Sequence, residues 1–144
     1  MDRAAMIEAF NSIVTVHDAR SLRESLSPRE REEVETTVAE LFDLLGKAHA
    51  MAILSLFAFA DKPLRFSEIE STLEIAPNTL SVRLQEFVAA GLLSRTTYDE
   101  VPPRVEYHPT RKAKALFPVF GYVHVWAIEH ELNAPNDGDR RSTK

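Results

Sequence analysis

The stretch from Leu64 to Leu93, LRFSEIESTLEIAPNTLSVRLQEFVAAGLL, constrains the fold of this chain more than any other part of it. Ser67 and Glu70 have the spacing of a capping box, which predicts the start of a short helix. Pro77 suits the first position of a second helix, and Gly91 suits the left-handed residue that ends one. The few residues between the two helices leave room only for a turn, so the stretch predicts a helix-turn-helix unit.

Two short strands follow this unit and are predicted to form a β-hairpin. The first is LLSRTT, and the second is RVEYH, in which apolar Val105 and Tyr107 alternate with polar residues. Between the strands, Pro102 and Pro103 fix φ and stiffen a polar tip. A further very short strand is predicted at residues 64–66. The order helix, turn, helix, ribbon predicts a winged helix-turn-helix, a mainly α fold with a small β-hairpin.

Helical segments are also predicted before this unit. Ser27, Pro28 and Glu30 fit a capped helix start. The segment HDARSLRES before it is interpreted as a loop or a broken turn, and KAHAMAILSLFAFA after it is interpreted as a central helix buried on nearly every face. The apolar stripe of the capped helix consists of Val34, Val38, Leu41, Phe42 and Leu45.

The last predicted helix, from about Thr110 to Leu132, is apolar around almost its whole circumference. A monomer of this size cannot cover every face of such a helix, so a second subunit is expected to pack on it. The predicted divisions are an N-terminal helical extension for dimerisation (1–40), the winged helix-turn-helix (41–109), a C-terminal dimerisation helix (110–132) and a disordered tail (133–144). The residues predicted for the dimer interface are Met6, Phe10, Phe117, Phe120, Val123, Trp126 and Ile128.

Composition excludes several classes of protein. The chain has no cysteine, which excludes disulfides, thiolate zinc sites and thiol-based redox sensing within it. No apolar run approaches the ~18 residues of a membrane helix and no signal peptide is visible, so a cytoplasmic protein without a membrane partner is expected. The sequence lacks a phosphate-binding glycine loop, a nucleophile elbow and histidines at metal-ligand spacing, so neither an enzyme nor a cofactor or metal site is expected.

Four segments carry a family resemblance. They are LFDLLGKAHAMAIL, LRFSEIE, APNTLSVRLQEFVAAGLLSR and YDEVPPRVEYHPT, and together they resemble the HxlR-type winged-helix transcription regulators. The resemblance implies a homodimer that binds double-stranded DNA at an inverted-repeat operator, with the terminal helices forming the dimer. This chain departs from the family where Ala48 and His49 follow Lys47, since a tryptophan is usual there.

The second helix of the unit, about 77–90, is the predicted recognition helix in the major groove, and the wing, about 95–108, is predicted to lie at the minor groove. On a helical wheel, Leu80, Leu84, Phe87 and Val88 face the core. Outward amides suit adenine, and an outward valine suits a thymine methyl group. The residues predicted to contact DNA are Lys47, Arg65, Ser67, Asn78, Thr79, Ser81, Val82, Arg83, Gln85, Arg95 and Arg104.

Several of these assignments have alternatives. Arg104 either enters the minor groove or pairs with Asp99 or Glu100 to hold the shape of the wing. Arg83 either contacts a phosphate or pairs with Glu86. The net charge of -5 keeps open a module that binds proteins instead of DNA. An unidentified small-molecule effector between the two subunits is a further expectation.

Overall fold

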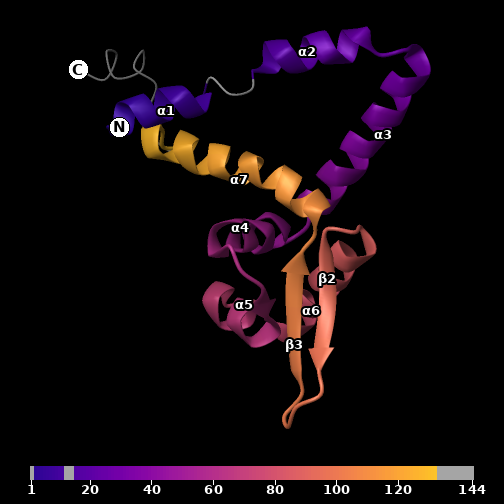
Figure 1. The fold of residues 1–144 in the computed structure, drawn as a ribbon, viewed down its shortest axis with the longest axis vertical. Coiled ribbons are helices and arrows are strands. Elements are labelled where there is room, and N and C mark those ends of the chain that lie inside the picture. Colours follow the sequence, from indigo (N-terminus) through magenta and orange to yellow (C-terminus); the bar gives the residue numbers. More distant parts are fainter. Residues whose placement is uncertain (1, 12–14, 133–144) are drawn as a thin grey trace.

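Figure 1 shows a computed structural model that describes residues 2–11 and 15–132. The predicted tail lies outside the described residues. A winged helix-turn-helix forms the lower part of the view, and helices from both ends of the chain extend above it. The elements are α1 (Arg3–Asn11), α2 (Val16–Ser25), α3 (Pro28–Leu45), α4 (Ala50–Ala60), β1 (Leu64–Arg65), α5 (Phe66–Leu73), α6 (Pro77–Ala89), β2 (Leu93–Tyr98), β3 (Arg104–Pro109) and α7 (Arg111–Glu129).

The sheet is antiparallel and has the order β1-β3-β2. The predicted hairpin is confirmed, but a third strand joins it: Leu64 of β1 pairs with Tyr107, and Arg65 pairs with Glu106. Alternation along β3 places buried Tyr107 toward the core, and it places Glu106 on the opposite face. β1 therefore covers one edge of the hairpin and ties the wing to the start of α5.

The core lies where α4, α5, α6, the sheet and α7 meet. Leu80, Leu84 and Phe87 are buried as predicted, whereas Val88 is 37% exposed and does not belong to the core. Val88 lies about 100° around α6 from Phe87, which brings it to the edge of the buried face. The largest fully buried side chains are Phe57, Phe87, Ile53, Leu54, Ile69, Leu80, Leu84 and Leu93.

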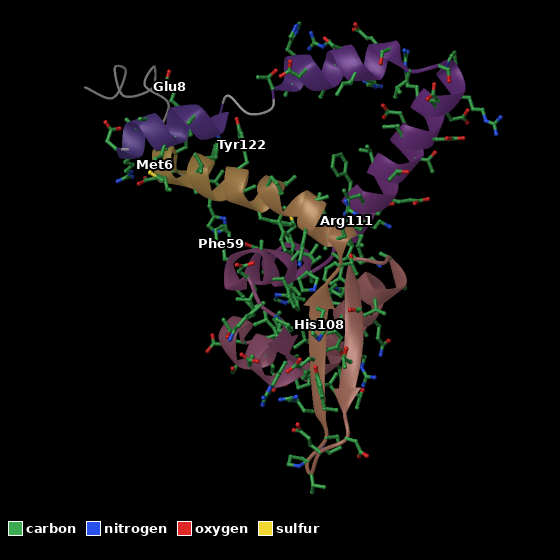
Figure 2. All side chains as sticks on the ribbon, viewed as in Figure 1. Met6, Glu8, Phe59, His108, Arg111 and Tyr122 are labelled. Carbon is green, nitrogen blue, oxygen red and sulfur yellow. The ribbon has the colours of Figure 1, made fainter. Side chains whose placement is uncertain are left out.

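The central helix α4 is buried on one side only, which corrects the expectation that nearly every face would be covered. Ile53 and Phe57 are fully buried, while Met51 and Phe59 remain exposed. The Phe59 ring lies 4.3 Å from the His124 ring of α7, measured between centroids, and Figure 2 shows Phe59 directed toward α7. α4 and α7 therefore pack against each other with apolar surface left over on both.

Two local predictions were wrong. HDARSLRES lies entirely within the helix α2. Thr15 and Asp18 start this helix by exchanging hydrogen bonds: the Thr15 N–H donates to Asp18 at 3.2 Å, and the Asp18 N–H donates to the Thr15 hydroxyl at 3.1 Å. The second error concerns α5, which begins at Phe66 rather than after Ser67. There the Glu68 carboxylate accepts from the Arg65 N–H at 3.1 Å, so Glu70 has no capping role.

α2 and α3 form what we call the arm. α3 begins with the predicted capping box of Ser27 and Glu30 and runs on to Leu45 without a break at residue 41. It meets α4 at a bend of 94° and leads away from the rest of the molecule, and α2 turns back above it (Figure 1). The apolar stripe of α3 is largely uncovered, with Phe42 68% exposed.

The residues predicted for the dimer interface have different surroundings in this structure. Phe120 is 2% exposed in the core of its own subunit, so its assignment to a subunit interface is corrected. Val123 and Trp126 of α7, by contrast, remain exposed. Met6 is exposed on α1, which lies beside the C-terminal half of α7 (Figures 1 and 2). Phe117 is half-buried, Ile128 is exposed, and the side chain of Phe10 lies outside the described residues.

Among the described residues, no single helix is long and apolar enough to cross a membrane, although α3 and α4 reach that length and composition as a bent pair.

Candidate nucleic-acid interface

The turn between α5 and α6 fixes how the two helices meet. Glu74 takes a left-handed conformation with φ 52° and ends α5. Ile75 is buried in the core and anchors the turn, and Pro77 then starts α6. The buried residues of α6 hold one side of this helix against the core, so the opposite side is presented outward.

That outward side carries most of the predicted base-reading residues. Asn78, Val82 and Gln85 are exposed on it. Thr79 and Ser81 are half-buried on its flanks, and the Gln85 amide lies 3.5 Å from the Ser81 hydroxyl. The structure therefore presents two amides and one methyl-bearing side chain on one helix surface, which is the set of groups that base edges in a major groove accept.

A hollow of about 600 Å³ is lined by residues of α6 and of the sheet. Arg95 of β2 lines it, because its cross-strand partner is Tyr107 and both side chains lie on the α6 side of the sheet. Within the described residues, the Arg95 guanidinium has no hydrogen bond or ion pair. The other lining residues are Phe66, Ser81, Gln85, Val88, Ala89, Val105 and Tyr107. A cation without a partner therefore faces open space beside the exposed surface of α6.

The wing holds Arg104 in place. The Arg104 Cζ lies 4.0 Å from the centroid of the Tyr98 ring, and its nitrogens lie 3.5 Å from carboxylate oxygens of Glu100 and Glu106. Its side chain is 26% exposed. Glu106 also lies 3.5 Å from His108 Nε2. The shape-holding alternative for Arg104 is thus present, and Tyr98 and Glu106 join Glu100 as its partners.

A second hollow, of about 510 Å³, lies between the wing tip and the start of α5. Arg65 and Ser67 line it on the α5 side, and residues 100–105 line it on the wing side. The structure therefore brings these two predicted DNA-contact residues close to the wing tip.

Lys47 and Arg83, both predicted to contact DNA, meet the same carboxylate. The Lys47 ammonium lies 3.1 Å from one Glu86 oxygen, and Arg83 Nη1 donates to both Glu86 oxygens at 2.9 and 3.0 Å. Hydrogen bonds from Lys47 and then from Arg83 hold the pKa of the Glu86 carboxyl below its usual 4.5. The ion-pair alternative for Arg83 is therefore the arrangement in the structure.

The lowered pKa of Glu86 predicts a pH-dependent stability. Because the folded pKa lies below the unfolded one, Glu86 stabilises the fold above about pH 4.5, and this stabilisation is lost as the pH falls through the folded pKa. Glu86→Gln should melt at a lower temperature than the wild type at neutral pH, and the difference should shrink as the pH falls below 4.5. Thermal melts over this range measure it, with Glu33→Gln on the exposed arm as control. A difference independent of pH would contradict the prediction.

Within the described residues, no cluster of three or more histidine or acidic side chains is arranged to hold a metal ion.

Comparison with known proteins decides the family. A family model described as HxlR-like helix-turn-helix matches residues 44–134, well over half of the chain. The chain belongs to the HxlR-like helix-turn-helix family. The match begins at the end of α3, so most of the arm and all of α1 lie outside the part that defines this family.

Relatives and solved structures agree with the HxlR-like assignment. The uncharacterized HTH-type transcriptional regulator BH0655 of Halalkalibacterium halodurans is 36% identical over 100 residues, which cover 69% of this chain and 88% of that protein. The reduced form of the transcriptional regulator YodB from B. subtilis has a TM-score of 0.55 at 30% identity, covering 76% of this chain and 99% of that one. The oxidized form of the redox regulator HypR has a TM-score of 0.55 at 27% identity, covering 66% and 97%.

The relatives are transcription regulators, and they place this HxlR-like chain among DNA-binding regulators with a winged helix-turn-helix. The redox descriptions belong to those other proteins, and this chain contains no cysteine.

Proposed function

We propose that the protein regulates transcription as a homodimer on double-stranded DNA, with α6 in the major groove and the β2–β3 wing at the minor groove. The observation that carries this proposal is the exposed surface of α6 beside the hollow lined by Arg95. The hollow lies between α6 and the wing. If α6 enters the major groove and the wing lies at the neighbouring minor groove, the phosphate strand between the two grooves passes over the hollow.

Base reading is assigned to the exposed residues of α6. The Asn78 and Gln85 amides each offer a donor and an acceptor, which match the N6 and N7 edge of adenine. The Val82 methyl groups suit the methyl of thymine. Their exposure supports the assignment, because these side chains can enter a groove without leaving the core.

Phosphate binding is assigned first to Arg95. Arg104 can reach DNA only by leaving Tyr98, Glu100 and Glu106, which costs it a cation–π contact and two charge contacts. We therefore assign Arg104 to holding the wing in shape. Arg65 and Ser67 face the hollow below the wing tip and are further candidates for backbone contacts.

Dimerisation is assigned to α7 and α3. Val119, Val123 and Trp126 are exposed on one side of α7, and Phe42 is exposed on α3. At about 100° per residue, the three α7 side chains fall within about 60° of one another and lie about 60–120° around the helix from buried Phe120. A two-fold dimer built on these surfaces would present two copies of α6, which is why an inverted-repeat operator is expected. The effector between the subunits also stays a prediction.

The test of the proposed function is selection of bound fragments from the source genome by the purified protein at two salt concentrations. Enrichment of an inverted repeat supports the proposal, and weaker enrichment at higher salt is expected from the phosphate contacts. The absence of enrichment at both salt concentrations would contradict it and favour the protein-binding module. The protein-binding alternative is supported by the ion pairs that Lys47, Arg83 and Arg104 make with carboxylates. These pairs leave few cations free to bind phosphates near α6 and the wing.

Arg95→Ala should weaken DNA binding at every sequence tested. The expected change is a slope of log K against log salt that is less steep by about 1, since one phosphate contact is lost. Arg29→Ala, at an exposed arginine of the arm, is the matched control and should leave the slope unchanged. Titrations of one enriched fragment at several salt concentrations measure both. An unchanged slope for Arg95→Ala would mean that Arg95 does not contact a phosphate.

A further inference from the structure

The turn at residues 46–49 joins the arm to the DNA-binding unit. Gly46 ends α3, and His49, with φ 66°, precedes the first residue of α4. Near this turn, Leu44 and Leu45 of α3 pack against the core, and Leu41 lines a hollow beside Leu92 and Leu116. The rest of the helix extends away from the core. The direction of α3 therefore depends on the conformation of a few residues.

One arginine of α6 binds this turn. Arg83 Nε donates to the Ala48 carbonyl oxygen at 2.9 Å, across 35 positions of sequence. Its Nη1 donates to Glu86 on the same helix, and Glu86 also takes the ammonium of Lys47 at 3.1 Å. The Arg83 side chain is only 13% exposed. We call this set of contacts among Lys47, Ala48, Arg83 and Glu86 the junction clasp.

The chemistry of the junction clasp requires an arginine. The guanidinium is a rigid, planar fork, so Nε and Nη1 can serve a backbone carbonyl and a carboxylate at the same time. A lysine has a single ammonium on a flexible stem and cannot hold both directions in a fixed geometry. Because Arg83 of α6 donates a hydrogen bond to the Ala48 carbonyl, the position of the turn is fixed relative to α6.

We propose that Arg83 is a positioning residue that fixes the direction of α3 relative to α6, and thereby sets the spacing between half-sites that the dimer accepts. This inference rests on the proposed function, since spacing has meaning only for a dimer on DNA. α3 carries part of the proposed dimer surface, so a change in its direction moves one α6 relative to the other. Half-sites in such dimers lie about 34–36 Å apart, and duplex DNA does not stretch to follow a displaced helix. Lys47 and Arg83 are therefore assigned to the junction clasp and not to DNA contact.

The first test measures geometry without DNA. Because the chain has no cysteine, Glu33→Cys on α3 and Gln85→Cys on α6 take spin labels at these two sites alone. Labelled protein is diluted with unlabelled protein, so that the distance distribution reports one subunit. Adding Arg83→Ala should broaden or shift the distribution, and Arg31→Ala on the exposed surface of α3 should not. A distribution for Arg83→Ala identical to that of the parent would overturn the inference.

A second variant keeps the test decisive if Arg83→Ala does not fold. If Arg83→Ala does not keep the helical circular dichroism of the parent, Arg83→Lys decides, because lysine can hold one of the two acceptors but not both. A broader distribution in Arg83→Lys supports the junction clasp, and an unchanged one overturns it. Lys47→Ala, which removes an exposed and weaker part of the clasp, should broaden the distribution less than Arg83→Ala.

The second test uses a pool of randomised duplexes. The wild type should enrich an inverted repeat with one preferred spacing, and Arg83→Ala should enrich the same half-sites over a wider or displaced range of spacings. The same single spacing in both proteins would overturn the link between the clasp and DNA. If the wild type enriches nothing, the proposed function fails, while the label distances still decide whether Arg83 positions α3.

Discussion

Phe87→Ala is expected to lower the free energy of unfolding by about 3–5 kcal/mol, a large part of the stability of a typical domain. Phe87 is 0% exposed and belongs to the core on the buried side of α6. Alanine would leave a cavity there, because the surrounding helices and sheet cannot collapse fully into the space. The loss should appear as a lower urea midpoint, measured at one fixed protein concentration because the proposed dimer would add to stability.

Val88→Ala is the matched control for this prediction. It changes the neighbouring residue of the same helix, but Val88 lies at the edge of the hollow and not in the core. Its effect on the urea midpoint should be much smaller. Equal losses in the two variants would contradict the burial of Phe87 and the exposure of Val88.

Val123→Glu is expected to dissociate the dimer. Burying a carboxylate in an apolar interface without a partner costs about 3 kcal/mol or more, which is on the order of a hundredfold or more in the dimer dissociation constant. Binding to an inverted repeat should fall with it, because each subunit then holds only one half-site. Sedimentation velocity over a range of concentrations measures the first effect, and titration of an enriched fragment measures the second.

Ile128→Glu provides the comparison on the same helix. Ile128 is exposed to a similar degree as Val123, but it lies about 140° around α7 from it. If Val119, Val123 and Trp126 form the subunit contact, Ile128→Glu should remain dimeric. A dimer that survives Val123→Glu but not Ile128→Glu would place the interface on the other side of α7, and the assignment of the dimer surface would be wrong.

Local signals in the sequence placed most of the elements. The capping box of Ser27 and Glu30 marked the start of α3, Pro77 marked the start of α6, and Gly91, with φ 75°, marked the end of that helix. Alternation of apolar Val105 and Tyr107 with polar residues marked β3. The same kind of signal was present for α2, where Thr15 and Asp18 have the capping spacing, but it was interpreted as a loop. These signals work because caps, prolines and periodic faces act within three or four residues of the chain.

The sequence by itself therefore determined the order helix, turn, helix, wing and the residues on the outward side of α6. The sequence offered Glu86 for Arg83 and Glu100 for Arg104, each within four residues of its arginine, but their other partners were decided only by the tertiary structure. Arg83 meets Ala48 across 35 positions, and Arg104 stacks on Tyr98 only because the hairpin pairs these two residues. Whether a cation faces DNA or a carboxylate depends on which side chains come within a few ångströms of it in space. That proximity is set by how helices and strands pack together, which no local pattern along the chain contains.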